Sequence, residues 1–360
     1  MRVTVDATSA LLRSAGIKAY TYHWVKSLRK LARPGEEIHA FPYLKDFGRL
    51  EHEASTLSRT ATLPRLALLY GVNIGGPAVL DTVLRGSHIF HGSNQVRLAP
   101  RKTLLTATVH DLTCFLMPEL HTAANVRADQ AFAEQVLKRA DGLIAVSENT
   151  RQDAIRILGI PPERITTVYS GVAEEYFTAR PTKRARPYVL SVGTIEPRKN
   201  LDGMLDAWKL MRPELRDAYD LVVAGPAGWG TESTLARIRE EAVYLGYVPE
   251  EQMPGLFAGA AAFIYPSLYE GFGFPVVQAM AGGVPVVTSN TSCLPEVAGG
   301  GALCVDPRSP QEIATGLEKL LEDKELRERI ARTGLKRAQR YRWVICAAQS
   351  LDFFRGVAGK

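Results

Sequence analysis

The stretch from Pro266 to Pro285, PSLYEGFGFPVVQAMAGGVP, combines a carboxylate, a glycine-rich turn and a helix start. Glu270 opens the turn, a glycine-aromatic-glycine step follows, and Pro275 stands where a helix would begin. Glycine lets the backbone approach a ligand closely, and proline suits the first helical position because no N–H is needed there. The helix start would offer free N–H groups to an anion such as phosphate. The pattern therefore predicts a phosphate-binding turn beside a carboxylate, with a tight packing turn as the alternative.

A second loop with suitable chemistry lies upstream, in the stretch YVLSVGTIEPRKN. An apolar strand ends at Gly193, an exposed turn is expected to carry Arg198 and Lys199, and a helix should begin near Asn200, a good N-cap residue. Ligands of open α/β sheets bind outside the carboxyl ends of strands. The planar fork of an arginine and the point charge of a lysine can together neutralise a diphosphate. The loop therefore predicts a diphosphate site, although a solvated Arg-Lys pair would give the same pattern.

A histidine at the end of another apolar strand is the third candidate. His110 follows Val109, and Asp111 comes next. An imidazole at the carboxyl end of a strand can donate a hydrogen bond to a ligand, and the carboxylate can order the loop. A histidine bonded only to nearby backbone is the alternative. His91 and Ser147 also follow strands; we interpret His91 as structural and Ser147 as a helix N-cap.

Composition describes an ordinary soluble α/β chain. The 360 residues exceed what a single core usually holds, so two domains are expected. No apolar stretch approaches the roughly 20 residues that would cross a bilayer. The four cysteines have neither paired nor metal-like spacing, which suits a reducing cytosol. We therefore expect a cytoplasmic protein.

The net charge of +6 is unevenly distributed. Residues 1–180 hold 22 Lys and Arg against 17 Asp and Glu, and the remainder holds 22 against 21. A basic first half favours an anionic membrane surface or a phosphorylated acceptor. We therefore include a peripheral contact with the inner membrane face among the expectations, although a solvated surface is the more ordinary explanation. Nucleic-acid binding has no supporting motif.

Alternation of short apolar strands with helical patterns predicts two parallel sheets. The expected domains are 1–172, completed by a final helix over 344–360, and 188–343, joined by a charged, proline-broken linker over 173–187. The region from Glu51 to Leu84 has no clear pattern beyond short apolar bursts. Strands are expected at Val3–Val5, Glu37–Phe41, His88–Phe90, Thr103–Val109, Leu143–Val146, Ile165–Val168, Val189–Val192, Asp220–Ala224, Ala261–Tyr265, Val284–Thr288 and Ala302–Val305.

Seven segments spread over nearly the whole chain carry a family resemblance. They are the glycine loop Ser14, Ala15, Gly16, Ile17, then VHDLTCFLMPE (Val109–Glu119), AVSENTRQD (Ala145–Asp153), SGVAEEYF (Ser170–Phe177), GTIEPRKNL (Gly193–Leu201), YEGFGFPVVQAMAGGVPVV (Tyr269–Val287) and LPEVAGGGALCVDP (Leu294–Pro307). In this order they resemble the retaining nucleotide-sugar glycosyltransferases of family 4, mannosyltransferase-like members above all. The resemblance implies the α/β GT-B fold, in which two Rossmann-like domains have parallel sheets facing across a cleft.

The resemblance also assigns roles to residues. It implies that His110 contacts the donor sugar near the anomeric centre and that Glu270 binds a sugar hydroxyl and stabilises positive charge on the ring. Arg198 and Lys199 would bind the diphosphate. The expected donor-binding residues are Gly16, Gly193, Arg198, Lys199, Gly271, Phe272, Gly273, Phe274 and Gln278.

One position departs from the family pattern. The family has a second glutamate eight residues after the first, where it accepts hydrogen bonds from the nucleotide ribose, and this chain has Gln278 there. Glutamine keeps a carbonyl acceptor but loses the charge and the second oxygen. We expect ribose binding to survive at reduced affinity.

The predicted function is metal-independent, retaining transfer of a hexose from a nucleotide-diphosphate sugar to a hydroxyl of a glycan, a lipid-linked acceptor or a small molecule. No cofactor is expected, and the chain has no Asp-x-Asp metal motif. GDP-mannose is the favoured donor; a UDP-hexose or an activated 6-deoxysugar remains open. A catalytically weak sugar-nucleotide-binding partner in a polysaccharide assembly complex is the alternative, favoured only by Gln278. A dinucleotide-dependent enzyme would need Gly-x-Gly-x-x-Gly after the first strand, which is missing.

Overall fold

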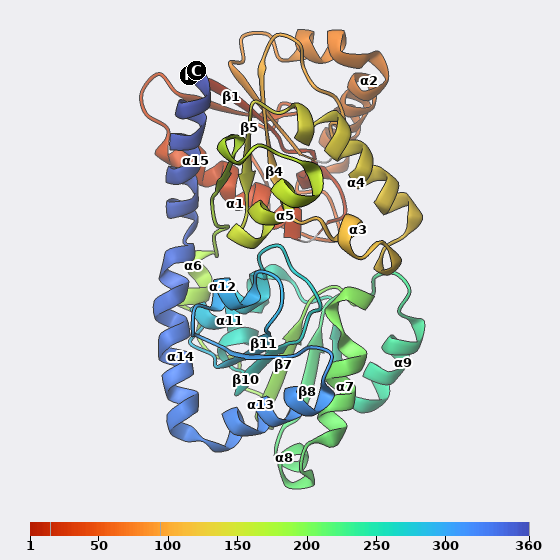
Figure 1. The fold of residues 1–360 in the computed structure, drawn as a ribbon, viewed down its shortest axis with the longest axis vertical. Coiled ribbons are helices and arrows are strands. Elements are labelled where there is room, and N and C mark those ends of the chain that lie inside the picture. Colours follow the sequence, from red (N-terminus) through yellow and green to blue (C-terminus); the bar gives the residue numbers. More distant parts are fainter. Residues whose placement is uncertain (15, 94, 360) are drawn as a thin grey trace. The chain divides into compact units, whose positions relative to one another are not determined.

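The computed structural model describes residues 1–14, 16–93 and 95–359. The chain forms two compact units, each built around its own parallel sheet (Figure 1). The first unit comprises Met1–Gly171 together with the chain from Trp343 onward, and the second comprises Val172–Arg342. The predicted linker 173–187 falls inside the second unit and contains a short helix, α6 (Glu174–Phe177).

The first unit has a six-stranded parallel sheet in the order β2-β1-β3-β4-β5-β6. Its strands are β1 (Arg2–Asp6), β2 (Glu37–Phe41), β3 (Ile89–Gly92), β4 (Leu104–Val109), β5 (Gly142–Ala145) and β6 (Ile165–Thr167). Its α-helices are α1 (Gly16–Leu31), α2 (Arg59–Val83), α3 (Thr113–Leu116), α4 (Ala123–Gln135), α5 (Glu148–Leu158) and α15 (Trp343–Ala358). The inner strands are almost fully buried, as expected for a parallel sheet that helices cover on both faces.

Helix α15, from the far end of the chain, packs against α1 in the first unit. The indole N–H of Trp24 on α1 donates to the Ser350 hydroxyl at 2.9 Å, and both side chains are buried. At the outer end of the helix, Arg355 forms a two-pronged pair with Glu36, at 2.8 and 2.9 Å. A buried hydrogen bond and a two-pronged ion pair therefore fix this helix to the first unit.

The second unit repeats the architecture with a sheet in the order β12-β11-β10-β7-β8-β9. Its strands are β7 (Tyr188–Val192), β8 (Asp220–Ala224), β9 (Val243–Gly246), β10 (Ala262–Tyr265), β11 (Val286–Ser289) and β12 (Leu303–Val305). Besides α6, its α-helices are α7 (Leu201–Leu210), α8 (Pro213–Ala218), α9 (Glu232–Glu241), α10 (Met253–Ala258), α11 (Phe274–Ala281), α12 (Leu294–Ala298), α13 (Pro310–Glu322) and α14 (Lys324–Ala338). Short 3-10 turns complete both units, at Thr8–Leu11, Pro118–Leu120, Leu137–Arg139, Pro162–Arg164, Pro197–Lys199, Glu250–Gln252 and Gln339–Tyr341.

Glycines let the loops after β7 and β8 run close together. A Cβ atom on Gly225 would lie 1.9 Å from the carbonyl oxygen of Gly193, so no other residue fits at Gly225 without moving the backbone. Because β7 and β8 are neighbours, this close approach holds the start of the Gly193 loop against the sheet.

The predicted strands are confirmed within one or two residues, but one strand and one long helix were not predicted. One is β9; the other is α2, which occupies most of the region from Glu51 to Leu84 that had no clear pattern. The prolines and glycines of α2 interrupt its helical sequence pattern, so the helix was not predicted. In the structure Gly76 has φ of 74° and breaks the helix just before Pro77.

The expectation that no stretch could cross a membrane is also wrong by length and composition. Among the described residues, α2 is 25 residues long. An 18-residue window of this helix has a mean hydropathy of 1.3, and only 11% of that window is buried.

Candidate active site

Neighbouring strands bring the two predicted loops together in the second unit. Strand β10 pairs with β7, with Ala262 opposite Val189 and Phe263 opposite Leu190. The carboxyl ends of parallel strands meet at one edge of the sheet, so the loops that follow lie side by side. The carbonyl oxygen of Arg198 accepts the Leu268 N–H at 2.9 Å, which ties one loop to the other.

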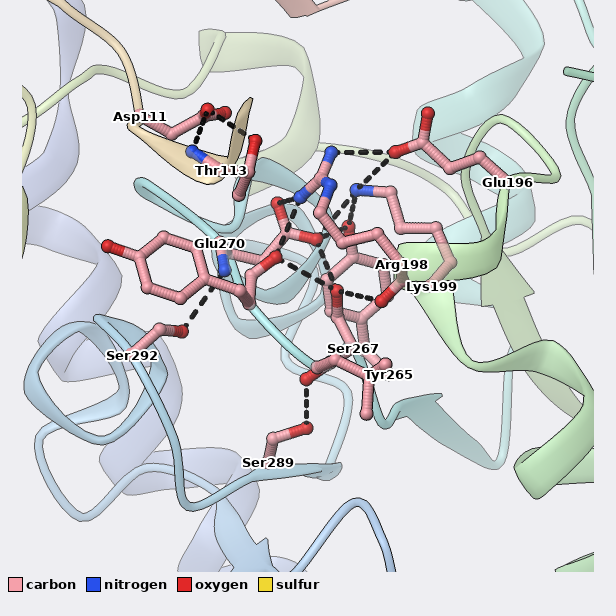
Figure 2. Close-up of polar contacts among 12 residues, drawn as sticks. Asp111, Thr113, Glu196, Arg198, Lys199, Tyr265, Ser267, Glu270, Ser289 and Ser292 are labelled. Carbon is pink, nitrogen blue, oxygen red and sulfur yellow. Dashed lines mark hydrogen bonds and ion pairs between the residues drawn. The ribbon is translucent and has the colours of Figure 1, made fainter. Parts of the chain in front are cut away.

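Glu270 is the centre of a buried polar cluster (Figure 2). Its Oε1 accepts hydrogen bonds from Lys199 Nζ at 2.6 Å, Tyr265 OH at 2.9 Å and Ser267 Oγ at 2.6 Å. Its backbone N–H donates to the hydroxyl of Ser292 at 3.1 Å. The carboxylate is therefore held in one place from both sides.

Arg198 completes the cluster and brings in a second carboxylate. Its Nη1 lies 2.9 Å from Glu270 Oε2 and also donates to the carbonyl oxygen of Tyr269 at 2.7 Å. Its Nη2 donates to Glu196 Oε1 at 2.6 Å, and Lys199 Nζ lies 3.9 Å from the same oxygen. Two cations thus face two buried carboxylates, and the formal charge of the four side chains is zero.

The two cations decide the ionisation of Glu270. Burial raises the pKa of the carboxyl group, but the charges of Arg198 and Lys199 and the hydrogen bonds from Lys199 and Ser267 outweigh it and lower the pKa to about 2. Glu270 is therefore a carboxylate at any physiological pH and can stabilise positive charge.

Two expectations about this loop need correction. The turn with Arg198 and Lys199 is not exposed: each side chain is only 12% accessible, because ion pairs with Glu196 and Glu270 draw both inward. Asn200 stands before α7 but its side chain does not cap the helix. Instead its amide donates to the carbonyl oxygens of Pro266 and Pro307, at 3.2 and 2.6 Å, and so joins three loops.

The turn after Glu270 starts a helix as predicted. Gly273 has φ of 82°, Phe274 is the first residue of α11, and Pro275 occupies the first turn. The ring of Phe272 packs edge-on against Phe274 at 5.2 Å and against Tyr341 at 5.4 Å. The side chain of Phe272 is thus a core contact, whereas Phe274 stays partly exposed. Gly271 is buried there, and Gln278 lies partly buried on α11.

His110 lies in the first unit, at the carboxyl end of β4. It is partly exposed, and its ring meets the ring of Tyr20 edge-on at 4.8 Å. Burial lowers the pKa of His110 to about 4, although Asp111 opposes the shift. The imidazole is therefore neutral at pH 7 and can donate one N–H. Asp111 orders the loop as expected, because its Oδ1 accepts both the N–H and the hydroxyl of Thr113.

The two lesser candidates have the structural roles predicted for them. His91 is buried, and its ring nitrogens lie 3.0 and 2.9 Å from the hydroxyls of Thr106 and Thr108. The hydroxyl of Ser147 accepts the N–H of Thr150 and caps α5.

Gly16 is the first residue of α1, so its backbone N–H is at a helix start; Ala15, in the same predicted loop, lies outside the described residues. Gly193 follows β7 directly and lies beside Lys199 and Tyr265 around a small cavity.

The structure thus gathers Arg198, Lys199 and Glu270 in one cluster and places His110 and Gly16 in the other unit. Sequence reasoning missed Glu196 as a partner of the cations, together with Tyr265, Ser267 and Ser292. A signal existed for Tyr265, the last residue of β10, and for Ser267, two residues beyond it, because both lie at the carboxyl end of a buried strand. Across residues 1–14, 16–93 and 95–359, no group of three or more His, Cys, Asp or Glu side chains is placed to hold a metal ion.

Two Rossmann-like units, each with its own six-stranded parallel sheet, are the architecture of the α/β GT-B fold. Solved structures support the fold over the full chain. A sucrose-phosphate synthase from Thermosynechococcus elongatus has a TM-score of 0.73 at 16% identity, with 99% of each chain covered. A complex of HepE from Anabaena with UDP-glucose has the same TM-score at 18% identity and the same coverage.

Family models cover both halves of the chain: "Glycosyltransferase Family 4" matches residues 15–176 and "Glycosyl transferases group 1" matches residues 172–337. The O-antigen chain mannosyltransferase B of Escherichia coli is 32% identical, with 94% of this chain and 96% of that protein covered. The chain therefore belongs to the GT-B glycosyltransferases of the mannosyltransferase type and is an enzyme of the transferase class. The comparisons give no support to the alternative of a catalytically weak binding partner.

Proposed function

We propose that this glycosyltransferase transfers mannose from GDP-mannose to a hydroxyl of a growing polysaccharide or another glycan or lipid-linked acceptor, with retention of the anomeric configuration. The observation that carries the proposal is the buried carboxylate of Glu270, kept ionised by Arg198 and Lys199 at the end of β10. The choice of sugar is supported by the identity of 32% to an O-antigen chain mannosyltransferase.

The proposed reaction matches each charge of the cluster with a charge that develops in the transition state. As the bond from the sugar C1 to the diphosphate oxygen breaks, positive charge appears on the ring and negative charge on the leaving group. Glu270 stabilises the first, and Arg198 and Lys199 stabilise the second, since fixed charges in a buried site need no reorganisation. The acceptor oxygen bonds to C1 on the same face, and its proton passes to the leaving phosphate.

In this proposal His110 acts as a neutral hydrogen-bond donor. A partly exposed imidazole with a pKa of about 4 donates an N–H to a sugar hydroxyl without adding charge near the ring. The backbone N–H groups at Gly16 and Phe274, each the first residue of a helix, add hydrogen bonds to the donor.

Two further parts of the proposal concern conditions. We propose that transfer needs no metal ion, because Arg198 and Lys199 supply positive charge for the diphosphate. A cytoplasmic location, where nucleotide sugars would be available, stays a prediction.

The test is a donor screen on the purified chain with lipid-linked glycan extracts as acceptors. Release of the nucleoside diphosphate should be fastest from GDP-mannose, should persist in excess EDTA, and should give an α-linked product by NMR. Glu270→Gln is the matched control and should be nearly inactive. Preference for a UDP-sugar would overturn the donor, and loss in EDTA restored by magnesium would overturn metal independence. Binding of GDP-mannose without consumption would overturn the transferase proposal.

A further inference from the structure

Helix α2 exposes a continuous apolar stripe that the proposed reaction does not use. Leu63, Ala67, Tyr70 and Ile74, all in the segment of α2 before the break at Gly76, follow one another at intervals of three or four residues, and all are exposed. Tyr70 and Ile74 are each 70% accessible. Residues three and four apart share one face of a helix, so these side chains form a single stripe. None of its members is charged, which is unusual for the surface of a soluble unit.

The opposite side of α2 is anchored to the first unit. Val72 and Leu80 are fully buried in the hydrophobic core of the first unit. The break at Gly76 and Pro77 bends the helix so that both segments keep a contact with that core. The helix is therefore long and apolar enough to cross a bilayer, but its buried face holds it flat on the unit.

The surroundings of the stripe are strongly basic. Residues 54–110 contain six Lys and Arg but only one acidic residue, Asp81. Asp81 Oδ1 accepts the N–H of Arg101 at 2.9 Å, and Asn73 accepts the N–H of Arg97 at 3.2 Å. These backbone bonds hold the loop that carries Arg97, Arg101 and Lys102 beside α2, at Asn73 and Asp81.

A hollow of about 850 Å³ opens beside the same helix. Pro77 of α2 forms one wall, and the lining includes His88, Arg101, Lys102 and Arg139, with Asp141 as its acidic member. Its size and its excess of cations suit a phosphate-bearing headgroup.

We propose that α2 lies in the interfacial plane of an anionic bilayer. The stripe enters the boundary between headgroups and acyl chains, and the cations of the neighbouring loop contact lipid phosphates. An exposed apolar helix face with basic surroundings is the pattern of helices that lie on a membrane rather than span it. Each Lys or Arg near an anionic surface adds about 1 kcal/mol of attraction. A second copy of the chain fits poorly, because the same basic face would repel itself.

The test is co-sedimentation of the full chain with vesicles of phosphatidylcholine alone or with about one third phosphatidylglycerol. Wild type should bind only the anionic vesicles and should be released at high salt. Ile74→Glu should weaken binding at least tenfold, and loss of both Arg101 and Lys102 to alanine should weaken it about fivefold per cation. The matched control is Leu210→Glu, since Leu210 is a 53% accessible leucine in the second unit; it should bind like wild type.

Several results would overturn the proposal. Equal binding by Ile74→Glu and wild type, or no preference for anionic vesicles, would exclude α2 as the contact. Retention in the membrane after carbonate extraction would mean that the helix spans. Concentration-dependent dimers that Ile74→Glu abolishes, with no vesicle binding by wild type, would assign the stripe to a second copy. Melting temperatures of all variants should match wild type, because the altered side chains are exposed.

Discussion

Glu270 stays charged inside the protein because two cations and three hydrogen-bond donors surround it. The pKa of about 2 depends on the positions of Arg198 and Lys199 more than on solvent, since the carboxylate is buried. Each cation therefore has two tasks: it stabilises the folded loop and supplies charge to the proposed reaction. Removing either one should affect turnover and stability together, because a buried charge left without its partner is costly.

We predict that Lys199→Met lowers turnover at least 100-fold, the typical effect of losing one charge-stabilising group, and also lowers the melting temperature. Ser267→Ala is the control: it removes one donor to the same oxygen but no charge, so its effect should be much smaller. Steady-state kinetics and thermal denaturation measure both. Adding Glu270→Gln to Lys199→Met should recover part of the stability and none of the activity. Near-normal turnover of Lys199→Met would contradict the assignment.

Gln278 is the position where the chain departs from its relatives, and its effect can be isolated. Gln278→Ala should weaken GDP binding by about 0.5–1.5 kcal/mol if the amide meets a ribose hydroxyl. Gln278→Glu should change the affinity by no more than about 1 kcal/mol, because a stronger charged acceptor is opposed by repulsion from the diphosphate. Calorimetric titration of GDP into the three proteins decides the matter. Equal affinities for wild type and Gln278→Ala would show that this side chain does not touch the ribose.

The motif residues of the site could be predicted, and their partners could not. Glu270 and the Arg198–Lys199 pair each follow an apolar strand in a short, recognisable run. Ser292 reaches the backbone of Glu270 from 22 residues further along the chain, and no local pattern encodes that contact. Glu196 was visible in the same run, but its pairing with Arg198 depends on how the loop folds inward.

At the scale of elements, short apolar runs were sufficient to predict nearly every strand, since the strands of a buried parallel sheet are almost continuously apolar. The same reasoning failed for α2, where Pro64 and Pro77 and three glycines interrupt the pattern. Tertiary contacts of Val72 and Leu80 maintain this helix despite its poor local propensity. Segments held by packing in this way are the ones that periodicity misses.

Helix α15 gives a prediction at this scale, because one buried hydrogen bond links it to α1. Ser350→Ala leaves the indole N–H of Trp24 buried without its acceptor and should cost about 1–3 kcal/mol of stability. Gln349→Ala, at the exposed neighbouring position, should stay within about 0.5 kcal/mol of wild type. Chemical denaturation measures both variants. Equal stabilities of Ser350→Ala and wild type would mean that the hydrogen bond between Trp24 and Ser350 contributes nothing to the free energy of unfolding.

At the scale of the whole molecule, the two units differ in the groups that acid would titrate. Burial lowers the pKa of His91 to about 3 and that of His110 to about 4, and both lie in the first unit. In the second unit Glu270 has a pKa of about 2, against an ordinary value of 4.5. A histidine with a lowered folded pKa costs stability as pH falls below 6.5, because the unfolded chain binds the proton first. A glutamate with a lowered pKa keeps its contribution until the pH falls below about 4.5.

The first unit should therefore lose stability between pH 7 and pH 5, a range in which Glu270 leaves the second unit unaffected. At pH 5, His91 alone should cost about 2 kcal/mol, and His110 should add less because solvent reaches it. For a unit of this size, 2 kcal/mol corresponds to roughly 4–8 °C in melting temperature. Calorimetric scans of the full chain at both pH values measure the shift. Ile264→Val, in the core of the second unit, costs about 0.5–1.5 kcal/mol and identifies the transition of that unit. His91→Gln should reduce the pH dependence of the other transition. Two results would contradict this account. One is a melting temperature of the first unit that depends on pH as strongly in His91→Gln as in wild type. The other is a larger shift at acid pH in the transition that Ile264→Val assigns to the second unit.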